Sequence, residues 1–416
     1  MLILNEMKKK ISLWTLFLVV FLDLVGIGII IPILPLVFFH TDVLPGSVLD
    51  SARNMLLGLL IASYPFAQFF GAPILGAFAD RYGRRPVLLV SLLGAAAGYL
   101  LFGLGLLISN VYLLFFSRIL AGFTAGNIAV VKSIIADVSD EESKVKNFGL
   151  IGMGFGLGFI LGPFLGGILT NSNLVSWFDA STPFWFAAVL LFLNIIFVFS
   201  RIEETLEKPS NIKINAWTGF INIKKAFQMP ALKIIFLSYF LLMFGFSFFT
   251  QFFPVFLYDK FGYNPSQIGF LFGFVGIWIA LAQGVFIRPV AKRYMPQQVI
   301  KVTMLFVSIF LMMVLLPKNH LMLYLILPFV AISNGMNMPN FSALFSNNAS
   351  KDSQGEILGI EQSVLSFAMF IPPIISGFAI SFSSSLPIML ASIFIFMAWL
   401  SFVFFYKNAK QKFSEV

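Results

Sequence analysis

A tight loop between two long apolar runs reads GAPILGAFADRYGRR at residues 71–85. Its charged residues are Asp80, Arg81, Arg84 and Arg85. A simple connecting loop needs only polar residues. This loop also has glycines at fixed positions in the sequence relative to Asp80, namely Gly76 before it and Gly83 after it. An acid beside arginines at a helix end can accept charge-assisted hydrogen bonds, either from those arginines or from the N-terminus of a neighbouring helix. The loop therefore indicates membrane spans joined by a specific structure.

The composition requires a lipid-facing surface. Hydrophobic residues make up 59% of the 416 residues and charged residues only 11%, with a mean hydropathy of +0.94. A soluble domain carries about 25% charged residues, so this chain has too few to cover itself in water. It has no cysteine and two histidines, which excludes disulfides and thiolate metal sites and offers no metal cluster. No cofactor is expected.

Twelve apolar segments are each long enough to cross a bilayer. They show no alternating strand pattern, and lipid offers backbone amides no other partner, so all twelve are predicted as helices. Their predicted limits are residues 12–39, 54–79, 86–107, 110–137, 147–170, 182–200, 232–257, 266–290, 299–317, 321–345, 357–383 and 386–406. The first segment is too long for a signal peptide and is predicted to remain as a span. The predicted fold class is an all-α membrane protein with twelve transmembrane helices.

Lysine and arginine are distributed unevenly between the loops. If the lysines at residues 8–10 are cytoplasmic, the loops alternate from there. The basic residues that then fall in outside loops are only Arg53, Lys260 and Lys318. This bias follows the positive-inside rule and predicts that both termini are cytoplasmic, in what we expect to be a bacterial cytoplasmic (inner) membrane. The net charge of +9 is therefore a signal of topology and not of nucleic-acid binding.

The longest polar stretch divides the chain into two sets of six spans. We predict an N-terminal six-helix bundle at residues 1–200, a cytoplasmic linker at 201–231 and a C-terminal bundle at 232–416. The halves are weak repeats, because ADRYGRRP has an echo in VAKRYMPQ at 290–297, which keeps basic residues but lacks the acid and the glycine. Such an arrangement is typical of alternating-access transporters with a site at the midplane. Residues 213–228 fit either a helix on the inner surface or a solvated linker.

One acid lies deep inside the first span. Asp23 occurs in FLDLVGIGIIIPILP, about eleven residues and roughly 16 Å into the span, which is near the bilayer centre. A carboxylate there is costly unless it is protonated, paired or hydrated. It is therefore either a proton carrier or substrate counter-ion, or a structural hydrogen-bond partner of a neighbouring helix. Pro32 and Pro35 are predicted to bend the outer half of the same span.

One arginine lies inside the fourth span, VYLLFFSRILAGFTAGNIAVVK. Arg118 is about 10 Å below the predicted outer surface. Because arginine stays charged, it must find a carboxylate, carbonyl groups or water, or else extend to the interface. Lys132, near the inner end of the span, reaches the interface easily.

The second half offers fewer charged groups. Glu361 is its one acid inside a span, about one turn into the eleventh, and is either a second protonation site or a residue at the wet inner end. Candidates for lining a substrate cavity are Asn127 in the first half and six polar or aromatic residues in the second: Gln251, Trp278, Gln283, Asn334, Asn337 and Asn340. Aromatic rings such as Trp278 stack on flat or cationic ligands.

The pattern Gly-x-x-x-Asp-Arg-x-Gly-Arg-Arg at residues 76–85 resembles the signature between helices 2 and 3 of the major facilitator superfamily of secondary transporters. This resemblance implies two pseudo-symmetric six-helix bundles. It also implies that the loop holds the cytoplasmic side closed in the outward-facing state, with Asp137 and the start of span 11, near Gly355 and Gly359, as candidate partners. The alternative is an inside-positive loop without a switching role.

Two further motifs resemble those of particular members. Arg118, Gly122 and Gly126 resemble the helix-4 motif of proton-linked members, in which the arginine influences an acid's proton affinity. GFILGPFLGG resembles the span-5 signature of the drug/proton antiporters, which importers usually lack; its residues are Gly158, Gly162, Pro163, Gly166 and Gly167. The glycines one turn apart favour close helix packing, and the proline is predicted to kink the helix. Packing alone is the alternative function of this motif.

The resemblance covers the whole chain and is closest to the tetracycline-exporter-like branch. Matches in the second half include FQMPALK before span 7 and YNPSQIGFLFG into span 8. Three departures stand out: Gly98 where those exporters have an aspartate, no histidine near Trp278, and no acid at residues 299–317. The resemblance therefore implies a monomeric antiporter that exports a compound in exchange for protons, and the cargo stays open among drug-like compounds, a siderophore or another metabolite.

Other classes are less well supported. A facilitator importer of the same fold is the closest alternative, and the span-5 signature argues against it. An enzyme is not indicated, because the sequence has no Ser/His/Asp set, histidine cluster or phosphate-binding Gly-Lys-Ser/Thr loop. The expected partners are a small-molecule substrate, protons and the lipid bilayer, with no nucleic acid.

Overall fold

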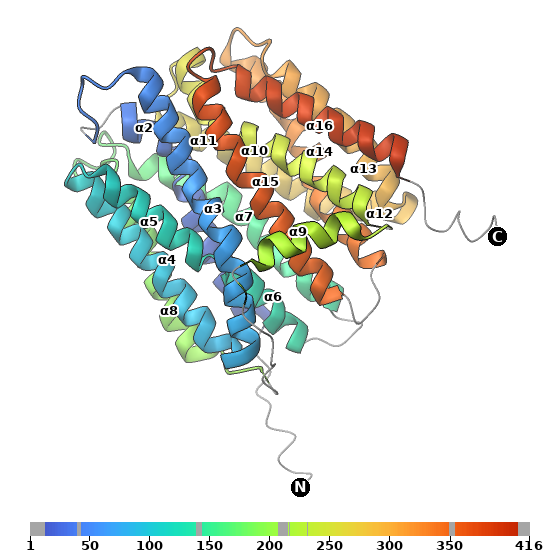
Figure 1. The fold of residues 1–416 in the computed structure, drawn as a ribbon. Helices are drawn as coiled ribbons and strands as arrows, with labels where there is room; N and C mark the ends of the chain where they lie inside the picture. The colour runs from blue at the N-terminus through green and yellow to red at the C-terminus, as the bar shows by residue number, and fades with distance from the viewer. Residues whose placement is uncertain are drawn as a thin grey trace, which may run out of the picture.

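The computed structural model describes residues 13–39, 43–138, 144–206, 215, 217–230, 232–348 and 354–406. Every regular element in these residues is a helix, and the long helices run side by side in one bundle (Figure 1). The elements are α1 (Leu13–Ile29), α2 (Leu34–Phe39), α3 (Asp50–Tyr82), α4 (Arg84–Leu107), α5 (Val111–Thr124), α6 (Asn127–Val138), α7 (Lys144–Leu169), α8 (Thr182–Arg201), α9 (Thr218–Gln228), α10 (Lys233–Phe261), α11 (Pro265–Leu281), η1 (Ala282–Phe286), α12 (Ile287–Arg293), α13 (Pro296–Met313), α14 (His320–Asn347), α15 (Gln354–Ala379) and α16 (Leu386–Phe405).

The predicted all-helical membrane fold is confirmed. Within the described residues, ten helical stretches are long and apolar enough to cross a membrane. Two shorter apolar helices, Trp14–Ile29 and Gly156–Leu169, correspond to the first and fifth predicted spans. The helical pattern follows from composition, because each apolar run can satisfy its backbone amides in lipid only within itself.

Two hydrophobic cores lie within the bundle. One is built mainly by α1 to α8 and the other by α9 to α16. Aromatic rings contribute to both: Phe102 and Phe184 stack at 4.2 Å between centroids in the first, and Phe236 and Phe345 at 4.5 Å in the second. Each half therefore packs chiefly within itself.

The first span is interrupted, which corrects the continuous segment predicted at residues 12–39. The chain leaves helical geometry between α1 and α2, where the Ile33 amide bonds the Ile30 carbonyl at 3.0 Å in a tight turn. Pro32 has no amide to donate, and its ring conflicts with the preceding turn. The prolines of this segment thus accompany a break and not merely a bend.

The fourth span, predicted as one helix at residues 110–137, is also broken, between α5 and α6. Side chains of neighbouring helices bond the carbonyls at the break. The Gln68 side-chain amide donates to the Ala125 carbonyl at 3.2 Å, and the Ser91 hydroxyl donates to the Thr124 carbonyl. A break at membrane depth is stable only with such partners.

The eighth span carries a π-helical turn. The predicted segment 266–290 is divided into α11, η1 and α12, with Gln283 in the turn. A π turn inserts an extra residue into the helical repeat and is often found at functional sites.

Two helix pairs join the halves: α7 packs on α11, and α3 packs on α15. The contact between α3 and α15 begins near Asn54, whose side-chain amide lies 3.4 Å from the Ser381 hydroxyl. It extends to Phe69, whose ring lies 5.7 Å from the Phe367 ring. These contacts of α3 with the second half lie between Asn54 and Phe69 and do not reach the Asp80 loop at the end of the helix.

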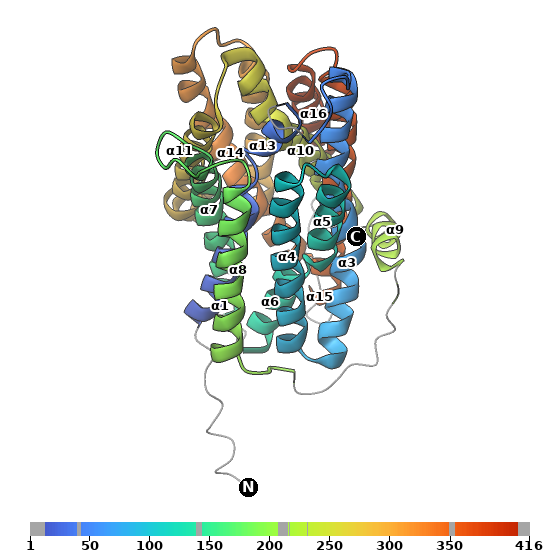
Figure 2. The ribbon, with the colours of Figure 1, turned by 90° about the vertical axis from the view of Figure 1, so that its left-hand side faces the viewer.

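Helix α9 lies across the α3–α15 seam, on the flank of the bundle (Figures 1 and 2). The Phe220 ring lies 4.9 Å from the Phe69 ring of α3, and the Asn222 amide donates to the Ser363 hydroxyl of α15 at 3.0 Å. Of the two alternatives for residues 213–228, the structure has a helix, at Thr218–Gln228, and this helix contacts both halves. Residues 207–214, 216 and 231 of the predicted linker lie outside the described residues.

Candidate functional site

Asp23 lies in the middle of α1, with 4% of its surface exposed. The Asn127 side chain, at the start of α6, lies within hydrogen-bonding reach of the Asp23 carboxylate. The break between α5 and α6 is what places Asn127 at a helix start beside α1. The Oδ2 atom of Asp23 has no hydrogen-bond partner. A purely structural role accounts for only one of the two carboxylate oxygens, because an unpaired buried acceptor is destabilising.

Arg118 of α5 lies in the same region of the first half. Its guanidinium carbon is 4.6 Å from the centroid of the Tyr64 ring of α3, a cation–π contact. Its Nε atom is buried and has no hydrogen-bond partner. Arg118 therefore does not extend freely to the interface, and in the described residues no ion pair joins it to Asp23.

Tyr64 and Tyr99 complete this cluster, and neither was predicted from the sequence. Both tyrosines lie close enough to Asp23 and Arg118 to interact with them electrostatically. Tyr99 also lies against Gly26, where a Cβ atom would be 3.4 Å from the tyrosine hydroxyl. The one indication in the sequence was that both tyrosines lie inside apolar spans. A buried tyrosine hydroxyl normally has a polar neighbour, so each could have been expected near another polar group.

The span-5 signature lies on a helix that touches both halves. On one face of α7, a Cβ at Gly162 would be 2.6 Å from Gly28 Cα of α1, and a Cβ at Gly166 would collide with the Ile29 carbonyl. Gly158 packs in the same way on Leu24. The absence of side chains thus permits backbone-to-backbone packing of α1 and α7.

The other face of α7 contacts α11 in the second half. A Cβ at Gly167 would lie 2.6 Å from the Pro265 carbonyl, and the Ser266 hydroxyl donates to the Gly167 carbonyl at 2.7 Å. A Cβ at Gly269 would lie 2.5 Å from the Pro163 carbonyl. The helix runs through Pro163 without interruption. The motif therefore lies at the contact between the halves.

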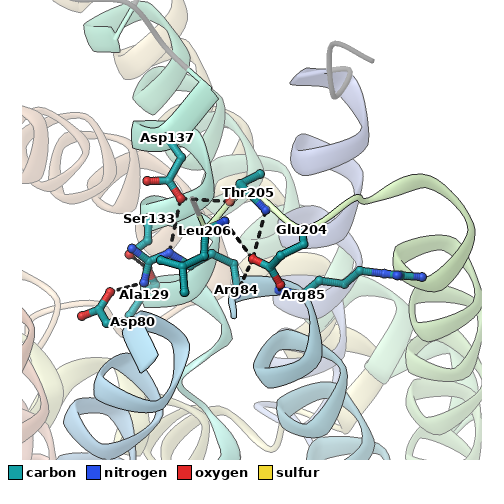
Figure 3. Close-up of polar contacts among 9 residues, drawn as sticks. All are labelled: Asp80, Arg84, Arg85, Ala129, Ser133, Asp137, Glu204, Thr205 and Leu206. Atoms are coloured by element: carbon teal, nitrogen blue, oxygen red, sulfur yellow. Dashed lines mark hydrogen bonds and ion pairs between the residues drawn. The ribbon is translucent and has the colours of Figure 1, made fainter. Parts of the chain in front are cut away.

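The Asp80 loop forms a network of charged groups within the first half (Figure 3). Arg84 pairs with Asp80 through Nη1, and its Nε atom lies 3.3 Å from Asp137 Oδ2 of α6. Gly83 adopts a φ of 114°, a conformation that favours glycine. Arg81 extends over the Tyr82 ring, and Gly76 has no neighbour where a Cβ would stand.

Glu204 joins this network from the linker, and no role for it was predicted from the sequence. Its carboxylate accepts the Arg84 amide at 2.8 Å and the Arg85 amide at 3.2 Å, so it caps the N-terminus of α4 (Figure 3). The adjacent Thr205 hydroxyl donates to Asp137 at 2.9 Å. An acid at a helix N-terminus is favourable, but its distance of 120 residues from Arg84 gave no local signal.

The second predicted partner of the loop is not in contact with it. In the described residues, no hydrogen bond or ion pair joins Asp80 to α15. The carbonyl of Gly359, near the start of α15, accepts instead a 3.5 Å hydrogen bond from Asn222 of α9. The surroundings of Gly355 lie outside what the structure describes.

Glu361 of α15 is buried, with 6% of its surface exposed. The Ser342 hydroxyl donates to its Oε1 at 3.3 Å, and the Tyr239 hydroxyl lies beside the carboxylate. Lys132 of the first half is near enough to interact with it electrostatically. Glu361 is thus not at a wet helix end, and unlike Asp23 it has neighbours from both halves.

The predicted cavity residues of the second half do not form one cluster. Asn337 is fully buried and accepts the Thr303 hydroxyl at 2.6 Å, and Gln251 donates to the Ser247 hydroxyl at 3.0 Å. Asn340 donates to the Met336 carbonyl at 2.7 Å. The Asn337 bond joins α14 to α13, whereas the Gln251 and Asn340 bonds lie within their own helices.

Three others remain available to a ligand. Asn334 lines an apolar pocket with Phe249 and Phe272, and its Oδ1 atom has no partner. Gln283 lies near α7, where a Cβ at Gly156 would be 3.5 Å from its Oε1. Trp278 contacts Phe274 at 6.2 Å between ring centroids.

A bundle of apolar helices in two halves, with a buried acid and a partly buried base in one of them that do not pair with each other, is typical of a membrane transporter. The family model described as the Major Facilitator Superfamily matches residues 16–373. The chain belongs to this superfamily, and the predicted family resemblance is confirmed. It is accordingly an integral membrane transporter and not an enzyme.

Relatives and solved structures agree with this assignment. The chain is 30% identical over 372 residues to the tetracycline resistance protein, class C, of Escherichia coli, covering 89% of each chain. It is 29% identical to the quinolone resistance protein NorA of Staphylococcus aureus, covering 98% of this chain and 99% of NorA. The crystal structure of the human organic anion transporter MFSD10 has the same fold, with a TM-score of 0.74 at 22% identity, covering 95% of this chain and 99% of MFSD10.

Proposed function

We propose that this chain is a proton-coupled antiporter that exports drug-like compounds. The observation that carries the proposal is Asp23, a buried carboxylate with one oxygen left unpaired, in a cluster with Arg118. An ionisable group kept at membrane depth without a full set of partners marks a proton or substrate pathway. The relatives, which are resistance proteins for tetracycline and quinolones, support a drug-like cargo.

The proposed cycle exchanges a proton and a substrate at Asp23. The charged carboxylate attracts a substrate from the cytoplasm. After the halves reorient, protonation of the carboxylate from outside removes that attraction and releases the substrate. Arg118 stays charged throughout, so it favours return of Asp23 to the charged form when the site faces inward.

Alternating access requires the two bundles, residues 1–200 and 232–416, to rock about this site. The contacts of α7 with α11, and of α3 from Asn54 to Phe69 with α15, hold one end of the seam closed. The Asp80 loop lies at the other end. We propose that it forms its contact with α15 when that end closes, since in this structure its charges are paired within the first half.

The proposed topology has both termini in the cytoplasm of a bacterial cell, with the protein acting as a monomer in the inner membrane. The support is the near absence of lysine and arginine from alternate loops. Labelling of single cysteines introduced at Arg53 and Glu203 with an impermeant reagent tests it, because the chain has no native cysteine. Cell-surface labelling is expected at the first position only.

The central test is transport in liposomes. The protein is reconstituted, a pH gradient is imposed, and movement of a panel of fluorescent lipophilic compounds is followed, with Asp23→Asn as the matched variant. Gradient-dependent movement that the variant lacks is expected. Full coupled transport by Asp23→Asn contradicts the assignment, whereas no transport by folded wild-type protein directs the search to a siderophore or other dedicated metabolite, or to uptake.

A further inference from the structure

Helix α9 docks on the α3–α15 seam with one face. Gly219 and Ala226 are buried, and a Cβ at Gly219 would lie 2.8 Å from the Phe69 ring of α3. On the same face, the Asn222 amide donates to the Ser363 hydroxyl of α15 at 3.0 Å. These contacts fix the orientation of α9 about its own axis, so its other face points away from the bundle.

The outward face of α9 carries large apolar side chains beside a lysine. Trp217, Ile221 and Lys224 recur at intervals of four and three residues and therefore share this face. Trp217 is 64% exposed and Ile221 is 41% exposed, and Lys224 is exposed as well. Phe227, near the edge of the face, is also exposed. Apolar residues together with lysine on the accessible side of a helix are typical of a helix that lies in the membrane interface.

The contact with Phe69 sets the depth of α9 in the membrane. Helix α3 has 33 residues and is about 50 Å long, which exceeds the roughly 30 Å of a bilayer's hydrocarbon core. Phe69 lies about 29 Å from the Asp50 end of α3 and about 20 Å from its Tyr82 end. Even if all the excess length projects beyond the membrane at the Tyr82 end, α9 contacts α3 at the boundary of the core. The outward face of α9, on the flank of the bundle (Figure 2), is therefore turned toward lipid.

The charge around this face is positive. Lys224, Lys225 and Lys233 are all exposed on α9 or at the start of α10, and the sequence has no acid between Glu207 and Asp259. In the described part of the chain, no ion pair joins Lys224 to an acid. Lysines close to a bilayer surface attract anionic headgroups, and their long side chains extend to reach them.

We propose that the outward face of α9 binds an anionic phospholipid, whose headgroup contacts Lys224 and whose acyl chains cover Trp217 and Ile221. Lipid is the occupant that matches both the depth of α9 and its positive charge. The inference concerns the linker and goes beyond the proposed transport cycle. It means that the bilayer contacts the linker at the place where α3 and α15 meet, so bound lipid holds α9 on the seam.

Nitroxide-labelled lipids test this inference with a single reporter. The chain has no native cysteine, so the variant Ile221→Cys carries one NBD fluorophore on the outward face of α9. The protein is placed in nanodiscs of equal amounts of phosphatidylcholine and phosphatidylglycerol, in which one lipid or the other bears a nitroxide on its upper acyl chain. Because a nitroxide quenches NBD only at short range, the two quenching values report which lipid lies beside α9. Phosphatidylglycerol is expected to quench about twofold more than phosphatidylcholine, and added salt is expected to reduce the difference.

Matched variants locate the preference. Lys224→Gln, made in the Ile221→Cys protein, is expected to bring the ratio of the two quenching values close to one. Arg201→Gln removes one positive charge from the exposed end of α8, which lies apart from α9 (Figures 1 and 2), and is expected to leave the ratio unchanged. An NBD label at Val90→Cys, on the exposed side of α4, is expected to be quenched equally by the two lipids. All these positions are exposed, so folding is expected to be retained.

Three results overturn the inference. A label at position 221 that neither lipid quenches shows that α9 faces water or another protein. Equal quenching by the two lipids contradicts an anionic partner, and a preference that Lys224→Gln leaves unchanged contradicts the assigned contact. No transport is measured, so failure here is distinct from failure of the antiport proposal.

Discussion

The two halves of this transporter treat buried polar groups differently. In the first half, the buried Asp23 and the partly buried Arg118 each keep an unpaired atom. In the second half, the buried acid Glu361 accepts a hydrogen bond from Ser342. The buried atoms without a partner in the described part of that half are all uncharged: Asn334 Oδ1, Asn337 Nδ2 and the hydroxyls of Tyr239, Ser366 and Ser376. The difference indicates that the first half carries the charge chemistry.

The seam between the halves shows a second contrast. At the end of the bundle distant from the Asp80 loop, glycines allow backbones of opposite halves to touch, as at Gly58 of α3 and Gly377 of α15. At the loop end, the charged residues bond within the first half and to the linker. Close backbone packing holds the two halves together at one end of the seam. At the other end, the charged residues do not join the halves, so they are free to form contacts with the second half in another conformation.

The largest expected effect separates the two buried acids. Asp23→Asn is expected to lower gradient-driven export at least 100-fold, which corresponds to about 3 kcal/mol, because the amide cannot exchange a proton. Glu361→Gln is expected to lower it by no more than about 10-fold, since its carboxylate already has neighbours. Proteoliposome transport measures both. Equal losses in the two variants contradict the division of labour between the halves.

The next effect concerns the glycine packing of α1 on α7. Gly166→Ala places a methyl group against the Ile29 carbonyl, and overpacking of this kind costs about 2 kcal/mol. The expected result is a lower midpoint of thermal unfolding, measured by tryptophan fluorescence in detergent. Gly359→Ala is the control, because a Cβ at Gly359 has no neighbour within 4 Å. Similar midpoints for the two variants argue against close packing at Gly166.

A smaller effect tests whether the buried amides of the second half are structural. Thr303→Val removes the hydroxyl that donates to Asn337 Oδ1 at 2.6 Å, and a buried acceptor left unsatisfied costs about 2 kcal/mol or less. Stability is expected to fall while gradient-driven transport of the fluorescent panel stays unchanged, and Thr303→Ser is expected to behave as wild type. A change in transport with unchanged stability assigns Asn337 to the substrate site instead.

The smallest effect concerns the cap on α4. Glu204→Ala removes the carboxylate that accepts the Arg84 and Arg85 amides, at a cost of about 1 kcal/mol. A modest drop in thermal stability is expected, and it is expected to shrink with added salt. Glu203→Ala, one residue earlier and exposed, controls for loss of charge. If Glu203→Ala has the same effect, the cap is not its cause.

Sequence periodicity and motif spacing predicted much of this protein. The twelve spans were found because hydrophobic length is a local property that lipid enforces. Arg84 and Asp137 were expected together, and they lie 3.3 Å apart between Nε and Oδ2. The helix breaks at Pro32 and between α5 and α6 were not predicted. A break in a membrane span is stable only if other groups bond the freed backbone atoms. The sequence does not show which distant side chains lie close enough to do so.

The residues that the sequence did not reveal all act across large separations. Glu204 caps a helix that begins 120 residues earlier, and Tyr64 contacts an arginine on another span. Neither has a local pattern that sets it apart from other acids near loops or other tyrosines in spans. Asn334 and Asn337, three residues apart, looked alike in sequence, and only packing separates an unpaired oxygen from a bonded one.

By itself, the sequence determined that the chain spans a membrane many times, that its basic residues favour one side, and that a few charges lie at membrane depth. These follow from solvent preference, which each segment expresses independently. Tertiary structure alone decided which of those charges pair. Pairing depends on angstrom-scale approach between helices distant in the chain, and glycine faces, helix breaks and one tyrosine ring set that approach here.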